Sequence, residues 1–167
     1  MREEIMGEIR ALTVRQPWAH MITYCGKSIE NRSWPTRYRG MLAVHAGARS
    51  GWDSDGQDSP LVQQAWSAWA NSAPALADGT IPLSRNTTSV TFSAVIAVAR
   101  ITGCHRAIGA AACSCSPWSQ ADQWHWELSN VRALDSPVPC RGSLGLWRLP
   151  EDAQTAVRDQ FNDSAGG

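Results

Sequence analysis

The chain has 167 residues, and its 15 basic and 15 acidic side chains give a formal net charge of zero at pH 7. This neutrality excludes a globally basic protein that attracts nucleic acid over its whole surface. The length suits one domain with a sizeable core, so we expect residues 1–167 to form a single domain. No run of eighteen apolar residues occurs, which excludes a transmembrane helix.

The N-terminal residues and the cysteines indicate the compartment. Residues 1–5 are too acidic and too polar for a secretory signal. The five cysteines are an odd number, whereas a secreted disulfide framework would more naturally hold an even one. We therefore expect a cytoplasmic protein with reduced thiols.

Apolar spacing and turn residues predict more strands than helices. Residues 9–14 are expected to form a first strand, and Pro17 suits the first turn of a helix that ends at Gly26. The strongest strand pattern covers residues 87–102, where β-branched and aliphatic side chains dominate. The other expected elements are strands at 27–34, 41–46, 124–134 and 143–149, a helix at 61–71, a short helix after Pro150, and loops at 35–39, 51–60, 72–86 and 103–120. Such elements favour a mixed α/β fold, a closed or half-closed barrel with helical flanks.

Strand alternation limits which side chains of residues 27–34 can meet. In a regular strand Lys27 and Asn31 face one side, whereas Glu30, Arg32 and Trp34 face the other. Lys27 and Glu30 therefore come together only if a bulge or turn intervenes between them. Lys27 is also the only lysine among the 15 basic residues. Its ammonium can lose a proton when desolvated, which a guanidinium does not do in practice.

Basic and acidic residues are segregated along the sequence. Between residues 10 and 50, seven basic side chains stand against Glu30 alone, whereas residues 51–80 hold four acidic side chains and no basic one. A local positive field can therefore exist despite the neutral total, acting over a Debye length of roughly 8 Å. The alternative is that these arginines are scattered, solvated side chains, since clustering in sequence need not be clustering in space.

Three motifs occur in order along the chain. The first joins Arg-Gln-Pro-Trp at residues 15–18 to Lys-x-x-Glu-x-Arg at residues 27–32, and the others are residues 40–46 and 139–147. Together they resemble the ASCH domain, a PUA-like β-barrel family, over residues 10–150. The resemblance implies a PUA-like barrel of five or six strands with flanking helices. Short polar N- and C-terminal extensions would lie outside residues 10–150.

The resemblance also implies a cleft at the barrel mouth that, in relatives, faces nucleic acid or modified nucleosides. On this basis we expect a nucleic-acid-binding module for RNA, DNA or modified bases, with RNA or a single strand favoured and no membrane partner. Arginine and lysine side chains would contact phosphate, an indole would stack on an unpaired base, and a carboxylate would accept a hydrogen bond from an exocyclic amine. The candidate binding residues are Arg15, Trp18, Lys27, Glu30, Arg32, Trp34, Arg37 and Arg39.

An enzyme is the main alternative. Small relatives hydrolyse acylated cytidine and pair the motif lysine with a threonine three residues on, where this chain has Glu30. As catalytic residues, Lys27 and Glu30 would make the chain a hydrolase, either an amidohydrolase of N4-acylated cytidine-type nucleosides or a ribonuclease. A structural salt bridge between the two residues and a protein-binding module that uses its indoles are the remaining interpretations.

No cofactor and no metal ion are expected. A zinc site would have to use Cys104, His105, Cys113 and Cys115, but Cys-x-Cys is tighter than the usual ligand spacing and the first two residues are adjacent. Half-buried free thiols are favoured instead. His45 is expected to be a satisfied core or rim histidine. The indoles expected to pack in the core are those of Trp66, Trp69, Trp124, Trp126 and Trp147.

Overall fold

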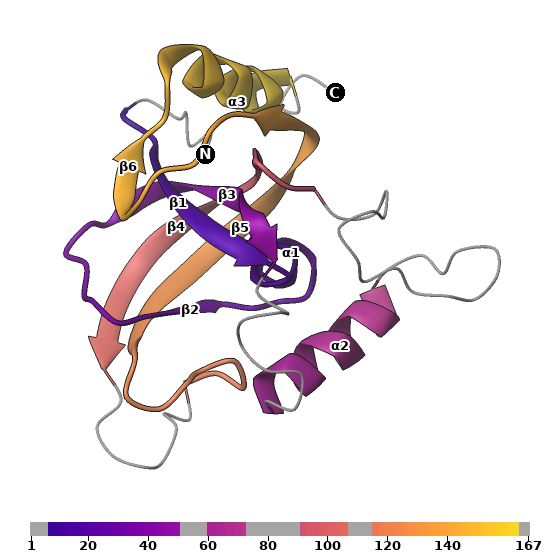
Figure 1. Ribbon diagram of the computed structural model, residues 1–167. Helices are drawn as coiled ribbons and strands as arrows, with labels where there is room; N and C mark the ends of the chain where they lie inside the picture. Colours follow the sequence, from indigo (N-terminus) through magenta and orange to yellow (C-terminus); the bar gives the residue numbers. More distant parts are fainter. Residues whose placement is uncertain (1–6, 51–59, 73–90, 107–114, 164–167) are drawn as a thin grey trace, which may run out of the picture.

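The computed structural model describes residues 7–50, 60–72, 91–106 and 115–163 (Figure 1). The expected loops at 51–60 and 72–86 lie almost entirely outside these residues, as does Cys113. The described elements, in chain order, are β1 (Arg10–Gln16), α1 (Trp18–Tyr24), β2 (Ile29–Arg32), β3 (Gly40–Ser50), α2 (Pro60–Ser72), β4 (Ala94–Arg106), β5 (Trp124–Pro139), β6 (Leu146–Arg148) and α3 (Glu151–Asp163).

The strands form one curled sheet in the order β2-β5-β4-β3-β1-β6. β1 pairs in parallel with β3, and the other neighbouring pairs are antiparallel. The curl makes a half-barrel, and α3 lies across one side of it (Figure 1). The expected mixed α/β fold, a barrel-like sheet of five or six strands with flanking helices, is therefore confirmed.

Two hydrophobic clusters occupy opposite faces of the sheet. Leu12 and Val44 belong to the cluster that includes residues of α1, whereas their chain neighbours Ala11 and Ala43 belong to the cluster that includes residues of α3. This alternation follows from the two-residue period of a strand. In β4, residues 94–99 are all buried, because both faces of this central strand are covered. Covering both faces explains why the β4 sequence reads as a continuous apolar run.

The bounds of all six strands differ from those expected: β2 covers only Ile29–Arg32, and β3 continues past residue 46 to Ser50. The differences at β4, β5 and β6 have identifiable causes. β4 begins at Ala94, after Ser93 turns the chain with a φ of 54°, and it continues past residue 102 to Arg106. β5 extends to Pro139, because shifts of register against β4 let it follow the curl of the sheet. β6 is limited to three residues, because Gly145 adopts a left-handed φ of 68° immediately before it.

The helices occupy the positions expected for them. α1 begins after Pro17, and Gly26, with a φ of 70°, follows its end. α2 packs against α1 through a third cluster formed by Met21, Ala65 and Trp118. Among the described helices, none is long and apolar enough to cross a membrane.

Candidate functional site

A recess of about 420 Å³ opens where β1 ends, α1 begins and β2 passes beside them. We call it the Lys27 recess. Its lining combines charged and apolar side chains. The charged ones are Arg15, Lys27, Glu30 and Arg32, and the apolar ones include Trp18, Leu61 and Leu144. A few charged groups among apolar walls are typical of a site that binds and orients a small molecule or a base.

A buried ion triad lies in this recess. Lys27 and Glu30 are only 2% and 6% exposed. The Lys27 Nζ donates to Glu30 Oε2 at 2.8 Å and to the Ile29 carbonyl at 2.5 Å. Arg32 Nη2 lies 3.1 Å from the other carboxylate oxygen and donates to the Thr13 carbonyl at 2.9 Å. Each oxygen of the Glu30 carboxylate therefore has a cationic partner.

The turn between α1 and β2 brings Lys27 to Glu30. Gly26 adopts a positive φ, and the backbone N–H of Lys27 donates to the Met21 carbonyl at 3.1 Å, still within the end of α1. β2 begins only at Ile29, so Lys27 precedes the strand and does not follow its alternation. Lys27 and Glu30 therefore meet because Lys27 lies outside the strand, and not through the bulge or turn between them that strand alternation would have required.

Glu30 is ionised at neutral pH. Burial alone raises the pKa of its carboxyl group, but the Lys27 ammonium and the Arg32 guanidinium together outweigh burial, so the net pKa is lowered. A carboxylate with a lowered pKa keeps its charge and accepts hydrogen bonds, but it does not supply a proton near pH 7. Its surroundings therefore make Glu30 a hydrogen-bond acceptor.

A second recess, of about 360 Å³, adjoins the first. Both recesses are lined by Thr13, Arg15, Ser143 and Leu144. We call the second one the Arg141 recess, because Arg49 and Arg141 add two guanidinium groups to that of the shared Arg15. None of its described lining residues is acidic. The two recesses therefore share a wall, and basic side chains outnumber acidic ones in their combined lining.

Thr13 lies in the wall that the two recesses share. Trp147 Nε1 donates to Thr13 Oγ1 at 3.2 Å, and that hydroxyl lies 3.3 Å from His45 Nδ1. His45 Nε2 lies 2.9 Å from the Cys140 carbonyl, so Nε2 carries the ring proton and Nδ1 accepts from Thr13. Burial lowers the pKa of His45, although the Cys140 carbonyl acts in the opposite direction. His45 is therefore a neutral, buried and hydrogen-bonded histidine.

Gly142 covers this hydrogen-bonded wall. A Cβ at Gly142 would lie 2.8 Å from Thr13 Oγ1 and 2.7 Å from His45 Cε1, closer than real side chains approach. Only a glycine lets the backbone of residues 141–143 pass over the pair without displacing it. The close approach places Arg141 and Ser143 at the rim of the recesses.

The structure brings together five of the eight predicted nucleic-acid-binding residues. Arg15, Trp18, Lys27, Glu30 and Arg32 all line the Lys27 recess. They come from β1, α1, the turn before β2 and β2 itself. Their roles stay predictions, but they share one cavity.

The other three predicted residues lie elsewhere. The Trp34 ring packs edge-on against Trp126, with ring centroids 4.5 Å apart. Arg37 and Arg39 line neither recess. Arg39 Nη1 instead donates to the carbonyls of Thr36 and Tyr38 in its own loop.

Sequence reasoning missed Asn31, Arg49 and Arg141. Asn31 Nδ2 donates to the Trp118 carbonyl at 2.9 Å, and its Oδ1 accepts the backbone N–H of Gln120 at the same distance. These two hydrogen bonds hold the segment at residues 118–120 against β2, at one wall of the Lys27 recess. The position of Asn31 inside the Lys-x-x-Glu-x-Arg motif could have identified it from the sequence. Arg49 belongs to the basic segment of residues 10–50 and Arg141 to the motif at residues 139–147, but neither pattern indicates that the fold brings them beside Arg15.

A separate group of possible metal ligands lies outside the described lining of both recesses. His105, Cys115 and His125 place their ligand atoms within 4.8 Å of one another. Cys104 does not join them, because it packs against the hydrophobic cluster and its Sγ accepts the backbone N–H of Thr36 at 3.5 Å. Cys113 lies outside the described residues. The sequence analysis had not considered His125.

A curled six-stranded sheet with flanking helices, and a charged recess at its mouth, defines a PUA-like barrel. The family model of the ASCH domain matches residues 12–138, more than half of the chain. The chain therefore belongs to the ASCH domain family, which confirms the resemblance seen in its motifs. A comparison with curated proteins found no match. Family membership is consistent, at a coarse level, with a nucleic-acid-binding module.

Proposed function

We propose that this chain is a nucleic-acid-binding module that holds one unpaired base in the Lys27 recess and the neighbouring phosphates in the Arg141 recess. The ligand is RNA or another single strand, because only an unpaired base can enter a recess of this kind. One observation carries the proposal. The ionised Glu30 carboxylate and the Trp18 indole line the same recess, and an arginine-lined recess shares its wall.

The Lys27 recess has the chemistry of a base pocket. Its volume of about 420 Å³ is in the range of sites that enclose small organic molecules. Trp18 is only partly buried, and stacking of a base on an indole contributes about 1–3 kcal/mol. The Glu30 carboxylate can accept from an exocyclic amine, as carboxylates do from cytosine. Stacking and a charged acceptor together would select for a base that carries an amino group.

The Arg141 recess supplies the contacts to phosphate. Arg15, Arg49 and Arg141 are all exposed, and a guanidinium group binds phosphate through a planar pair of donors. Arg15 lines both recesses and would therefore contact the phosphate next to the bound base. Phosphate contacts place the strand, and the base pocket selects the sequence.

The enzyme interpretation has less support. Hydrolysis of an acylated amine requires a nucleophile or base that can exchange a proton. Glu30 is held ionised by two cations, and the Lys27 ammonium donates to two oxygens inside the protein. We expect no turnover of acylated cytidine or single-stranded RNA by the full chain. Turnover that Lys27→Met abolishes, in a variant that remains folded, would place the chain among the hydrolases.

Base preference is the direct test of the pocket. Glu30→Gln keeps the size of the side chain but turns a charged acceptor into an amide that can also donate. We expect the preference among short C, A, U and G homopolymers to change by about 1 kcal/mol, roughly fivefold in affinity, while binding itself persists. Fluorescence anisotropy with labelled oligonucleotides measures this change, after circular dichroism has shown that the variant is folded.

The matched control for Glu30→Gln is Glu151→Gln, an exposed substitution at the start of α3. This control should leave every affinity unchanged. If Glu30→Gln gives the same order of base preference as the unmodified protein, the carboxylate does not contact the base and the pocket assignment fails.

Salt dependence tests the phosphate contacts. Each phosphate contact on a single strand contributes about −0.7 to the slope of log affinity against log salt, so three arginines predict a slope of roughly −2. Arg49→Gln or Arg141→Gln should make the slope less negative by about 0.7. Titrations at several salt concentrations measure both values.

The controls for this experiment are Arg37→Gln and Arg39→Gln. Both arginines lie in the basic loop that the sequence singled out, and both are exposed, but neither lines a recess. These variants should keep the full slope. A reduced slope in the loop variants, with a normal slope in Arg141→Gln, would show that the strand follows the loop instead of the Arg141 recess.

A further inference from the structure

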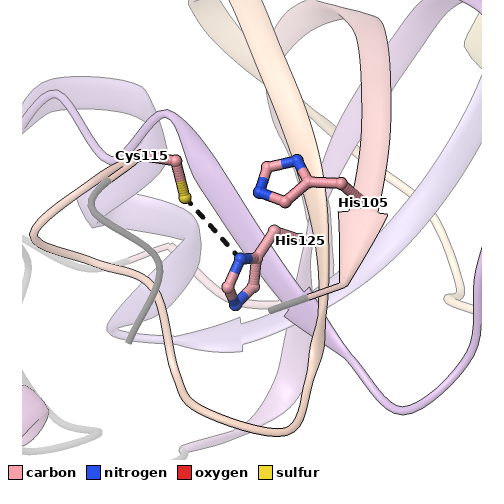
Figure 2. A group of neighbouring side chains, drawn as sticks. All are labelled: His105, Cys115 and His125. Atoms are coloured by element: carbon pink, nitrogen blue, oxygen red, sulfur yellow. Dashed lines mark hydrogen bonds between the residues drawn. The ribbon is translucent and has the colours of Figure 1, made fainter. Parts of the chain in front are cut away.

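Three side chains from separate segments converge beside the β4–β5 pair. His105 lies near the end of β4, Cys115 follows residues 107–114, and His125 lies near the start of β5 (Figure 2). Their possible ligand atoms all lie within 4.8 Å of one another. The group contains two imidazoles and one thiol, a combination that binds borderline-soft divalent metal ions.

Strand register explains how the two histidines meet. His105 and His125 are direct partners in the antiparallel pairing of β4 with β5. Residues that lie directly opposite in such a pair project from the same face with their Cβ atoms about 5 Å apart. The two rings are accordingly close together. Their centroids are 5.2 Å apart, and the ring planes are nearly perpendicular. The sheet therefore fixes two of the three ligands before any ion binds.

The thiol lies at the distance that a shared ion requires. Cys115 Sγ is 3.7 Å from His125 Nδ1, and Figure 2 shows the sulfur directed at that nitrogen. In a tetrahedral zinc site, with bonds of about 2.3 Å to sulfur and 2.05 Å to nitrogen, these two atoms are separated by roughly 3.6 Å. The observed separation therefore matches that of two ligands of one tetrahedral ion.

Hydrogen bonds on the far sides of the rings orient both histidines. His105 Nδ1 lies 2.6 Å from Glu127 Oε1, so this nitrogen donates to the carboxylate and the lone pair of the neutral ring is on Nε2. His125 Nε2 lies 2.6 Å from the Gln120 carbonyl, so it donates there and the lone pair is on Nδ1, the atom that faces the thiol. A carboxylate or a backbone carbonyl behind each histidine is the usual arrangement around bound zinc.

Gly103 makes room for the carboxylate behind His105. A Cβ at Gly103 would lie 2.5 Å from Glu127 Oε2, so any larger residue would displace that carboxylate. Gly103 is the direct partner of Glu127 in the β4–β5 register, and His105 lies two residues further along the same strand face. The glycine thus lets Glu127 extend along β4 and reach the ring of His105.

We propose that His105, Cys115 and His125 bind one zinc ion, with Glu127 and the Gln120 carbonyl as the groups that orient the histidines. Water completes the tetrahedron. On binding, the Cys115 thiol loses its proton to solvent and the thiolate bonds to the ion, so at least one proton is released per ion. This proposal is independent of the proposed nucleic-acid function.

Gln120 connects the proposed zinc site to the Lys27 recess. The Gln120 carbonyl accepts from His125, its N–H donates to Asn31, and Gln120 itself lines the recess. An ion that holds Cys115 and His125 together therefore also holds the segment from residue 115 to residue 120 against β2. The ion would stabilise one wall of the recess from behind.

Metal binding by the full chain tests the proposal, with Co²⁺ as a spectroscopic probe for zinc. The protein is freed of metal with a chelator, titrated with Co²⁺ and then back-titrated with Zn²⁺. We expect one Co²⁺ per chain, visible absorption typical of a tetrahedral site, a near-ultraviolet thiolate charge-transfer band, and displacement by Zn²⁺. A chain that takes up no Co²⁺ with a thiolate band would overturn the assignment.

Two variants separate this site from adventitious binding. Cys115→Ser should abolish the charge-transfer band, and Glu127→Gln should keep the band but weaken zinc binding about 10- to 100-fold. The matched control is Cys104→Ser, which removes a thiol one residue from His105 but outside the ligand group, and it should change neither property. An unchanged band in Cys115→Ser, or equal zinc affinity in Glu127→Gln and the unmodified protein, would contradict the proposed ligands. Glu127 is partly exposed, so its variant tests the site even if Cys115→Ser fails to fold.

Discussion

Glu30→Ala is expected to lower the free energy of unfolding by about 3–5 kcal/mol, the usual cost of removing one partner from a buried ion pair. The substitution leaves the Lys27 ammonium, which is 2% exposed, with only the Ile29 carbonyl among the partners described above. It also removes the carboxylate that Arg32 contacts. Because proteins of this size are stable by only about 5–15 kcal/mol, the loss should be plain in a urea unfolding curve.

An exposed ion pair provides the matched control. Glu8 contacts Arg10 and Arg148 at the surface, and Glu8→Ala should cost little stability, because solvent screens exposed ion pairs. A double variant, Lys27→Met with Glu30→Leu, should recover part of the lost stability, since apolar side chains of similar size replace the buried pair of Lys27 and Glu30 at little cost, whereas Arg32 still lacks its carboxylate partner. Equal losses for Glu30→Ala and Glu8→Ala would show that the triad is not buried in solution.

The pH dependence of the Glu30 contribution has a definite sign. The pKa of Glu30 is lowered in the folded protein, so the unfolded chain binds its proton at a higher pH than the folded one. The stabilising contribution is therefore fully present above the unfolded pKa of about 4.3, and it is lost as pH falls through the lowered folded pKa. The stability difference between the unmodified protein and Glu30→Gln should accordingly be largest near neutral pH and should shrink in acid.

Trp126→Ala is expected to cost about 3–5 kcal/mol of stability, the range measured for large aromatic residues in protein cores. Trp126 is completely buried, its Nε1 donates to the Trp34 carbonyl at 3.1 Å, and its ring packs against the Trp34 ring. It is also the direct partner of Glu30 across β2 and β5. Removing the indole would thus leave a cavity beneath the ion triad. Thermal and urea unfolding measure the effect.

Trp18→Ala is the contrasting variant. Trp18 is only partly buried and lines the Lys27 recess. Its replacement should cost less stability than that of Trp126, and should weaken binding of single strands by about 1–3 kcal/mol through lost stacking. If Trp18→Ala destabilises the fold as much as Trp126→Ala and leaves affinity unchanged, Trp18 is a core residue and the base pocket lies elsewhere.

Local patterns predicted most of the elements, and the resemblance of the three motifs to the ASCH domain predicted the PUA-like barrel. The continuous apolar run of β4, the helix from Trp18 to Gly26 and the final helix after Pro150 all depend on residues close in sequence. The strands expected at residues 9–14 and 41–46 correspond to β1 and β3. The boundaries were less accurate, because Ser93 and Gly145 end or delay strands through positive φ values that a hydrophobicity pattern does not contain.

The candidate site was predictable only where its residues lie close together in the sequence. The Lys-x-x-Glu-x-Arg motif contains the ion triad, but strand alternation argued against a contact between Lys27 and Glu30. That argument does not apply, because Lys27 precedes β2 and the two side chains meet. Arg37 and Arg39 cluster with the motif in sequence, yet neither lines a recess. Arg141 and His125 could not have been found in this way, since strand pairing and the return of the chain after β5 bring them to their neighbours.

The two outermost strands of the sheet limit how this protein can associate with others. β2 has four residues and β6 has three, so these two strands themselves offer few backbone donors and acceptors to an incoming chain. Long, flat margins are the usual starting points for aggregation and for the addition of extended peptides. An extended chain that paired with β2 or β6 would therefore gain few backbone hydrogen bonds from either strand.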